Sequence, residues 1–155
     1  MRPLILASVL LVLPAAAFAA EDPALRHARA LLAATPLIDG HNDLPWAIRE
    51  SETAPHDVAA YDLRSRTPGH TDLARMAAGH VGGQFWSVYV PSDLPADRAV
   101  TMTLEQIDAL LDMVRRNPDR LELARSADDV ERIAAAARVA SMIGVEGGQD
   151  QGLHR

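Results

Sequence analysis

Asp39, His41 and Asp43 alternate along one short segment of the chain. In an extended strand this spacing predicts that all three side chains project from one face, while Gly40 and Asn42 point to the other. An imidazole nitrogen and carboxylate oxygens are ligands that zinc accepts at about 2.0–2.2 Å. The same pattern also fits a polar strand end with a hydrogen-bonded histidine. Spacing alone therefore favours half of a metal site without choosing between these two interpretations.

Glu146 is a second candidate ligand, because it directly follows a predicted strand over residues 139–145. The glycines at 147 and 148 allow the backbone to approach a ligand closely. An isolated glutamate before a turn is otherwise most simply a solvated acid. In a two-metal hydrolase, a carboxylate can bridge ions that lie about 3.5–4 Å apart. Glu146 can take that role if the fold brings its strand next to the strand of His41.

Helices and strands are expected to alternate along the chain. The expected helices are 22–34, 71–78, 103–117 and 126–137, and the expected strands are 37–44, 84–90 and 139–145. Such alternation predicts an α/β fold made of parallel βα units. A closed barrel of this type needs eight strands and typically about 250 residues. About three strands can therefore form only part of one.

Side chains that cap helices set the expected starting points. Asp22, Thr71 and Ser126 each precede a segment with helical periodicity, and each can accept a hydrogen bond from a free backbone N–H. Thr103 begins a sequence with the capping-box pattern, which predicts the start of a helix with a 3.6-residue apolar period up to Asn117. Four capped helices are therefore expected.

Composition limits the class of protein. Apolar residues make up 48% and charged residues 23% of the chain, which is a globular balance. The formal net charge of -6 leaves no basic footprint for nucleic acid. The chain has no cysteine, so any metal site must be built from histidine and carboxylates.

The first residues predict a secretory signal peptide over residues 1–19, with cleavage after Ala19 or Ala20. A positive start is followed by an apolar run and then by small residues. Pro14 interrupts the apolar run, which disfavours the alternative of a membrane anchor, and no later segment predicts a transmembrane span. The mature domain, residues 20–155, is therefore expected to be exported to the periplasm or outside the cell.

Four blocks of the sequence resemble the membrane (renal) dipeptidase family, peptidase family M19. Residues 38–45 resemble its first strand, 82–91 its second and 144–148 its third, while 71–73 match the segment ahead of the second strand. The blocks follow the order and spacing of the family over about residues 25–148.

This resemblance implies the N-terminal part of a (β/α)8 TIM-like barrel that holds two zinc ions. His41 and Asp43 match ligands of the first zinc, and Glu146 matches the carboxylate that both ions share. Asp43 and Glu146 are thereby implicated in catalysis, and Trp46 matches an aromatic residue near the substrate. The implied reaction is hydrolysis of a dipeptide by a hydroxide that bridges the two metals.

The match ends shortly after the third block. The last seven residues do not follow the family pattern, and His154 does not match the histidines that complete the second zinc site in the family. We therefore expect residues 20–155 to form a truncated metallo-dipeptidase domain. Two alternatives stay open: a catalytically inactive exported fragment that lacks the second-zinc histidines, and a different two-metal amidohydrolase such as a lactonase. Dipeptide preference and oligomeric state are not indicated.

Overall fold

The computed structural model describes residues 22–147. The expected signal peptide (1–19) with its cleavage position and the last residues (148–155) lie outside the described residues. Along the described chain the elements are α1 (Pro23–Ala34), β1 (Leu37–Asn42), α2 (Leu44–Arg49), α3 (Leu73–Ala78), β2 (Val81–Tyr89), α4 (Ala96–Arg116), β3 (Leu121–Leu123), α5 (Ala127–Ala135) and β4 (Val139–Glu146).

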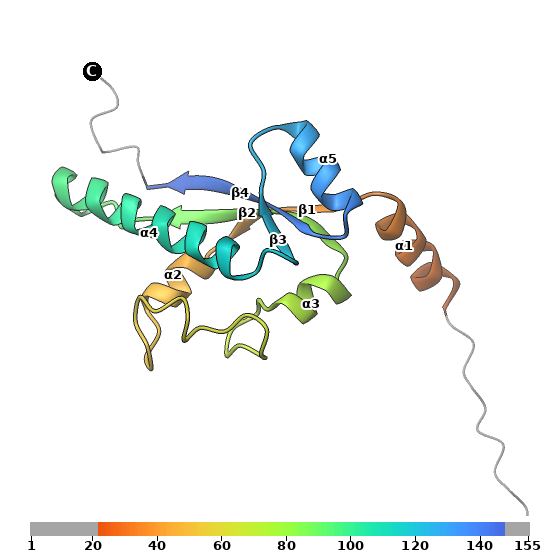
Figure 1. The fold of residues 1–155 in the computed structure, drawn as a ribbon, viewed down its shortest axis with the longest axis horizontal. Coiled ribbons are helices and arrows are strands. Elements are labelled where there is room, and N and C mark those ends of the chain that lie inside the picture. The colour runs from red at the N-terminus through yellow and green to blue at the C-terminus, as the bar shows by residue number, and fades with distance from the viewer. Residues whose placement is uncertain (1–21, 148–155) are drawn as a thin grey trace, which may run out of the picture.

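The strands form one parallel sheet in the order β1-β2-β4-β3 (Figure 1). The three expected strands are present as β1, β2 and β4, and they lie side by side in chain order. The expectation of about three strands misses β3, which pairs only with the first residues of β4, from Val139 to Ser141. Because β3 has three residues, it is too short to show an alternating pattern in the sequence.

Two of the expected helix caps are confirmed. Asp22 accepts a hydrogen bond from the backbone of Ala24 at the start of α1, and Ser126 accepts one from Asp129 at the start of α5. Each cap supplies an acceptor for a backbone N–H that has no partner within its helix.

The other two predicted caps, Thr71 and Thr103, are wrong. Asp72, and not Thr71, caps α3, because its carboxylate accepts the N–H of Arg75 at 2.8 Å. The helix expected from Thr103 begins earlier, at Ala96, and Thr103 lies inside it, where its hydroxyl donates to the carbonyl of Ala99. A competing acceptor one residue away and an earlier helical turn explain these differences.

Helix α2 was not expected, because the strand was predicted to continue to Leu44 and to end at Pro45. The chain instead leaves the sheet after Asn42 and turns into α2, with Pro45 in its first turn. Proline is well tolerated there because its missing N–H would have had no helical partner.

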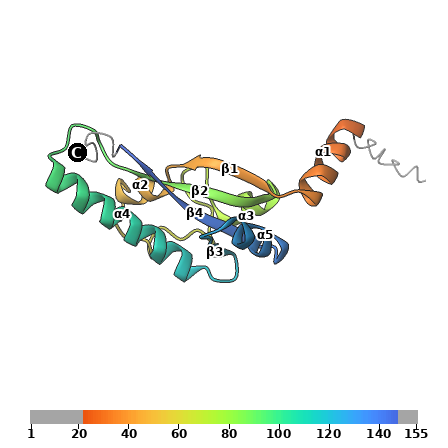
Figure 2. The ribbon, with the colours of Figure 1, turned by 90° about the horizontal axis from the view of Figure 1, so that it is seen from above.

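One face of the sheet is covered by α2, α3 and α4 (Figure 2). Trp86 and Val88 of β2 lie at the centre of this layer and are fully buried. The remaining buried core residues are Leu44, Ile48, Leu63, Leu73, Met76, Leu110, Met113, Val114, Leu121 and Val139. This core fixes the sheet against its helices and holds the carboxyl ends of the strands in place.

The opposite face of the sheet is covered only at its amino-terminal end. There α5 packs Ile133 against Ala140 of β4. Farther along the strands this face is more open, since Phe85 is 37% exposed and the side chain of Glu146 is 50% exposed. Helices on one face and an accessible second face are the arrangement of βα units in a barrel, where the helices lie outside. The structure is therefore α/β and corresponds to part of a TIM-like barrel.

Helix α1 extends away from the sheet and buries none of its residues (Figures 1 and 2). Among residues 22–147, no helix is long and apolar enough to cross a membrane.

Candidate metal centre

The carboxyl ends of β1 and β4 bring three candidate ligands together. His41 lies in β1, Asp43 follows that strand, and Glu146 is the last residue of β4. The Nε2 atom of His41 is 3.0 Å from Oδ1 of Asp43 and 3.5 Å from Oε2 of Glu146. One ligand atom from each residue lies within 4.8 Å of the other two. Within residues 22–147 this is the one such group of three histidine or carboxylate side chains.

An irregularity in β1 places His41. Asp39 pairs with Gln84 of β2, and Asn42 pairs with Trp86, so the two residues between them on β1 lie opposite the single residue Phe85. Two residues facing one is the definition of a β-bulge, which locally changes the direction in which side chains point.

The bulge corrects one expectation from the sequence. Asp39 and Asn42 both lie on the face covered by helices, since their partners in β2 share that face. Asp39 is therefore not in the group with His41, and the prediction of three side chains on one face is wrong for it. Its carboxylate accepts the backbone N–H of His41 at 3.1 Å instead. His41 and Asp43 do come together, as the sequence predicted.

Asp43 occupies the N-cap position of α2, where an aspartate usually accepts a hydrogen bond from the first turn. Here its side chain makes no capping hydrogen bond. Its Oδ1 faces the His41 imidazole instead, so its carboxylate is directed at the group of candidate ligands.

Glu146 is oriented by Ser87 of β2, whose hydroxyl donates to Oε2 at 3.0 Å. Ser87 is buried, while the side chain of Glu146 is 50% exposed. Gly147 follows with a φ of 82° and packs directly against the carbonyl of Val90, where a Cβ atom would collide. The sequence suggested that a glycine here allows close approach to a ligand; the structure shows close approach to a neighbouring strand end.

Trp46 lies in α2 with its ring edge-on to the ring of Tyr89, at a centroid distance of 5.0 Å and an angle of 82°. Tyr89 pairs with Glu146 in the register of β2 and β4. Trp46 is thus near the edge of the group of ligands, and its role at the substrate stays a prediction.

The donor set fits a divalent cation. One imidazole nitrogen faces two carboxylates, and a single N–H can serve only one of them, whereas a cation is attracted to all three groups. Histidine nitrogen with carboxylate oxygen is a ligand combination that zinc accepts. The group borders a hollow of about 280 Å³ that Gly40, Phe85 and Gly144 also line, so a small molecule can reach it.

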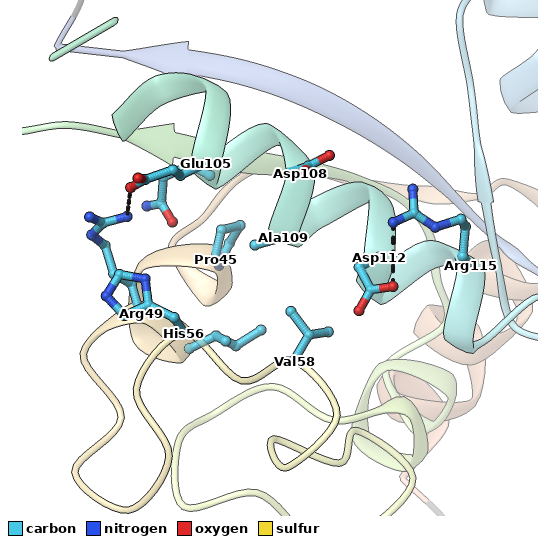
Figure 3. A pocket seen from close by; sticks show the side chains of 11 residues that line it. Pro45, Arg49, His56, Val58, Glu105, Asp108, Ala109, Asp112 and Arg115 are labelled. Atoms are coloured by element: carbon cyan, nitrogen blue, oxygen red, sulfur yellow. Dashed lines mark hydrogen bonds and ion pairs between the residues drawn. The ribbon is translucent and has the colours of Figure 1, made fainter. Parts of the chain in front are cut away.

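A larger groove of about 470 Å³ lies on the other side of the sheet, between α2 and α4 (Figure 3). Four of its charged residues form two ion pairs: Arg49 pairs with Glu105 at 2.9 Å, and Arg115 pairs with Asp112 at 3.3 Å. The groove contains none of the proposed ligands, so size alone does not identify the functional site.

Parallel βα units with histidine and carboxylates at the carboxyl ends of the strands are the arrangement of metal-dependent hydrolases built on barrels. The family model for membrane dipeptidases, peptidase family M19, matches residues 25–152. The chain therefore belongs to this family.

Individual relatives agree with the family match. Dipeptidase ataJ of Aspergillus terreus is 42% identical over 135 residues, covering 82% of this chain and 32% of that protein. Dipeptidase 3 of Mus musculus is 43% identical over 129 residues, covering 83% of this chain and 25% of that protein. The chain thus spans about a third or less of the length of the curated relatives it matches.

A solved structure is also similar: the metallo peptidase from Rhodobacter sphaeroides in complex with a phosphinate mimic of the dipeptide L-Ala-D-Ala. The TM-score is 0.62 at 26% identity, over 74% of this chain and 39% of that one.

Proposed function

We propose that the protein is a metal-dependent dipeptidase that hydrolyses the peptide bond of dipeptides, with zinc held by His41, Asp43 and Glu146. The observation that carries this proposal is the convergence of one imidazole and two carboxylates within 4.8 Å at the carboxyl ends of the strands. Membership of the membrane dipeptidase family and the similarity to a metallo peptidase that binds a dipeptide mimic support the choice of substrate class.

Each residue has a defined task in this proposal. His41 offers Nε2, and Asp43 offers Oδ1 on the same side of the imidazole. Glu146, held by Ser87, closes the group from the neighbouring strand. Zinc held by these residues would supply Lewis acidity and an activated water, and Glu146 would be the ligand shared with a second ion. Trp46 is proposed to contact the substrate at the edge of the site.

The two-zinc centre is proposed for the whole protein only. Two ions need more donors than the three that residues 22–147 bring together. The described group can supply one ion with three protein ligands, which is the number that catalytic zinc sites commonly use.

The alternative of a catalytically inactive exported fragment is less well supported. The candidate ligands converge, and the relatives that match are named dipeptidases. The alternative of a lactonase-like amidohydrolase is also weaker, because the matching family model is that of membrane dipeptidases.

The test is a dipeptide hydrolysis assay on the longest polypeptide encoded by the reading frame that contains this chain. We expect turnover that disappears on chelation, returns with Zn²⁺, and is lost in His41→Ala. A matched control is His70→Ala, which removes an exposed histidine outside the group. Turnover that survives both chelation and His41→Ala would rule out the proposed centre.

We also propose that the protein is exported, on the strength of the leader pattern at residues 1–19. Cell fractionation of the intact protein and of a version without residues 2–19 tests this. Export predicts that only the intact protein leaves the cytoplasm, with a new N-terminus at residue 20 or 21. Equal cytoplasmic retention of both would contradict it.

A further inference from the structure

Three uncharged polar side chains lie behind the candidate ligands, on the helix-covered face of the sheet. Asn42 comes from β1, Thr71 from the segment before α3, and Gln84 from β2. Gln84 is 1% exposed, and the other two are half-buried. Polar groups in such a position are costly unless they are hydrogen-bonded, so their partners indicate what they do.

Both the nitrogen and the oxygen of the Gln84 side-chain amide form hydrogen bonds. Its Nε2 donates to the backbone carbonyl of Asp39 at 3.3 Å and to that of Phe85 at 3.1 Å. Its Oε1 accepts from Nδ2 of Asn42 at 3.5 Å. The side chain therefore ties β1 to β2 at Asp39, immediately before the bulge, where the regular ladder between the strands is interrupted.

Asn42 acts on the other side of the bulge. Its Oδ1 accepts the backbone N–H of Leu44 at 3.0 Å, which fixes the turn into α2. Its Nδ2 donates to the hydroxyl of Thr71 at 3.0 Å as well as to Gln84. Thr71 thus connects Asn42 to the loop that precedes α3.

The two amides therefore bracket the ligand-bearing segment. Gln84 holds the carbonyl of Asp39 before the bulge, and Asn42 holds the N–H of Leu44 after it. His41 and Asp43 lie between these two fixed points. Because Asn42 makes the turn-forming hydrogen bond, Asp43 can direct its carboxylate at His41 although it occupies the N-cap position.

We propose that Asn42 and Gln84, anchored by Thr71, are positioning residues that preorganise His41 and Asp43 for metal binding. This inference rests on the proposed metal centre. Gln84 and Asn42 act through the backbone of residues 39–44, and Thr71 acts through the side-chain amide of Asn42. Groups that orient ligands in this way typically change metal affinity about 10- to 100-fold when they are removed.

The experiment measures zinc affinity of the metal-free, full 155-residue chain by competition with a chromogenic chelator. Thr71→Val removes the hydroxyl with little change of shape, and Gln84→Met removes the amide at similar volume. We expect both to weaken zinc binding by about 10- to 100-fold. Thr71→Ser keeps the hydroxyl and is expected to retain the wild-type affinity.

Two matched controls remove the same chemical groups elsewhere. Gln106 is also 1% exposed and donates from Nε2 to the carbonyl of Tyr89 at 3.3 Å. Thr103 donates to the carbonyl of Ala99 at 2.9 Å. Gln106→Met and Thr103→Val should lower the thermal unfolding midpoint as much as the test variants but leave zinc affinity unchanged.

The outcomes separate the two proposals. If the wild-type chain binds no zinc, the metal centre fails and the positioning role fails with it. If the wild type binds zinc and both Thr71→Val and Gln84→Met bind it equally tightly, the positioning role alone is wrong. The same holds if Gln106→Met and Thr103→Val weaken binding as much as the test variants. Should Gln84→Met not fold, the comparison of Thr71→Val with Thr71→Ser decides.

Discussion

The hydrogen bond from Ser87 to Glu146 gives a quantitative expectation for the variant Ser87→Ala. In the wild type, the hydroxyl holds the Glu146 carboxylate at 3.0 Å before any metal arrives. Without it, the glutamate must lose its rotational freedom during binding. Fully ordering a glutamate side chain costs about 1.5–2 kcal/mol.

The cost at Glu146 is smaller than this full value, because its side chain is 50% exposed and thus only partly buried. We take about half of the full value, about 1 kcal/mol, which corresponds to about fivefold weaker zinc binding. Chelator competition on metal-free protein resolves such a change.

Ser141 provides the matched control for this variant. It lies in the neighbouring strand β4, is fully buried, and within residues 22–147 its hydroxyl has no hydrogen-bond partner. Removing an unsatisfied buried hydroxyl is expected to be neutral or stabilising. Ser141→Ala should therefore leave zinc affinity unchanged and keep or raise the thermal midpoint. Zinc binding by Ser87→Ala that is as tight as in the wild type, or equal weakening in both variants, would contradict a role of Ser87 in holding Glu146.

Three further predictions follow from single residues. Gly147→Ala forces a Cβ against the Val90 carbonyl at a positive φ, so it should lower the free energy of unfolding by at least about 1 kcal/mol in a denaturant titration; an unchanged value would contradict this. The backbone N–H and the guanidinium of Arg75 hold the pKa of Asp72 below its usual value. The resulting stabilisation is complete above the unfolded-state pKa of about 3.9 and is lost as pH falls through the lower folded-state value. In Asp72→Asn, the thermal unfolding midpoint should therefore fall less steeply with decreasing pH than in the wild type. An equally steep fall in both proteins would contradict this. Trp46→Ala should raise KM for a dipeptide in the whole protein while zinc affinity stays the same; an unchanged KM would exclude contact with the substrate.

The strands that carry the site could be predicted from the sequence because their local signals are strong. The run from Gln84 to Val90 is rich in aromatic and β-branched residues, and the segment from Val139 ends at a glutamate followed by glycine. Both strands form, although β2 begins earlier than expected, at Val81. The short β3 forms by pairing with Val139 and its neighbours, and a sequence of three residues does not predict such a tertiary contact.

The face on which Asp39 lies could not be predicted in the same way. Strict alternation groups it with His41, but the bulge opposite Phe85 breaks that alternation. Next to the bulge, Gln84 of the neighbouring strand donates to the carbonyl of Asp39. The residue pattern of β1 alone does not predict this contact between two strands.

Polar residues inside an otherwise apolar strand were the signal for the residues that sequence reasoning missed. Gln84 and Ser87 interrupt the apolar run of β2, and both are buried in the structure. Most buried polar side chains have hydrogen-bond partners, so such residues in a strand indicate specific contacts. Here the partners are the backbone beside His41 and the carboxylate of Glu146. The helix caps were missed for a simpler reason, since Asp72 competes with Thr71 from the next position.

His41, Asp43 and Glu146 are proposed to bind a metal ion together. The most direct test is a crystal structure of the chain grown with Zn²⁺, with diffraction data collected on both sides of the zinc absorption edge. We expect an anomalous peak bonded to Nε2 of His41 and to carboxylate oxygens of Asp43 and Glu146, at about 2.0–2.2 Å. An anomalous peak bound to other residues, or none at this group in crystals that contain zinc, would contradict it.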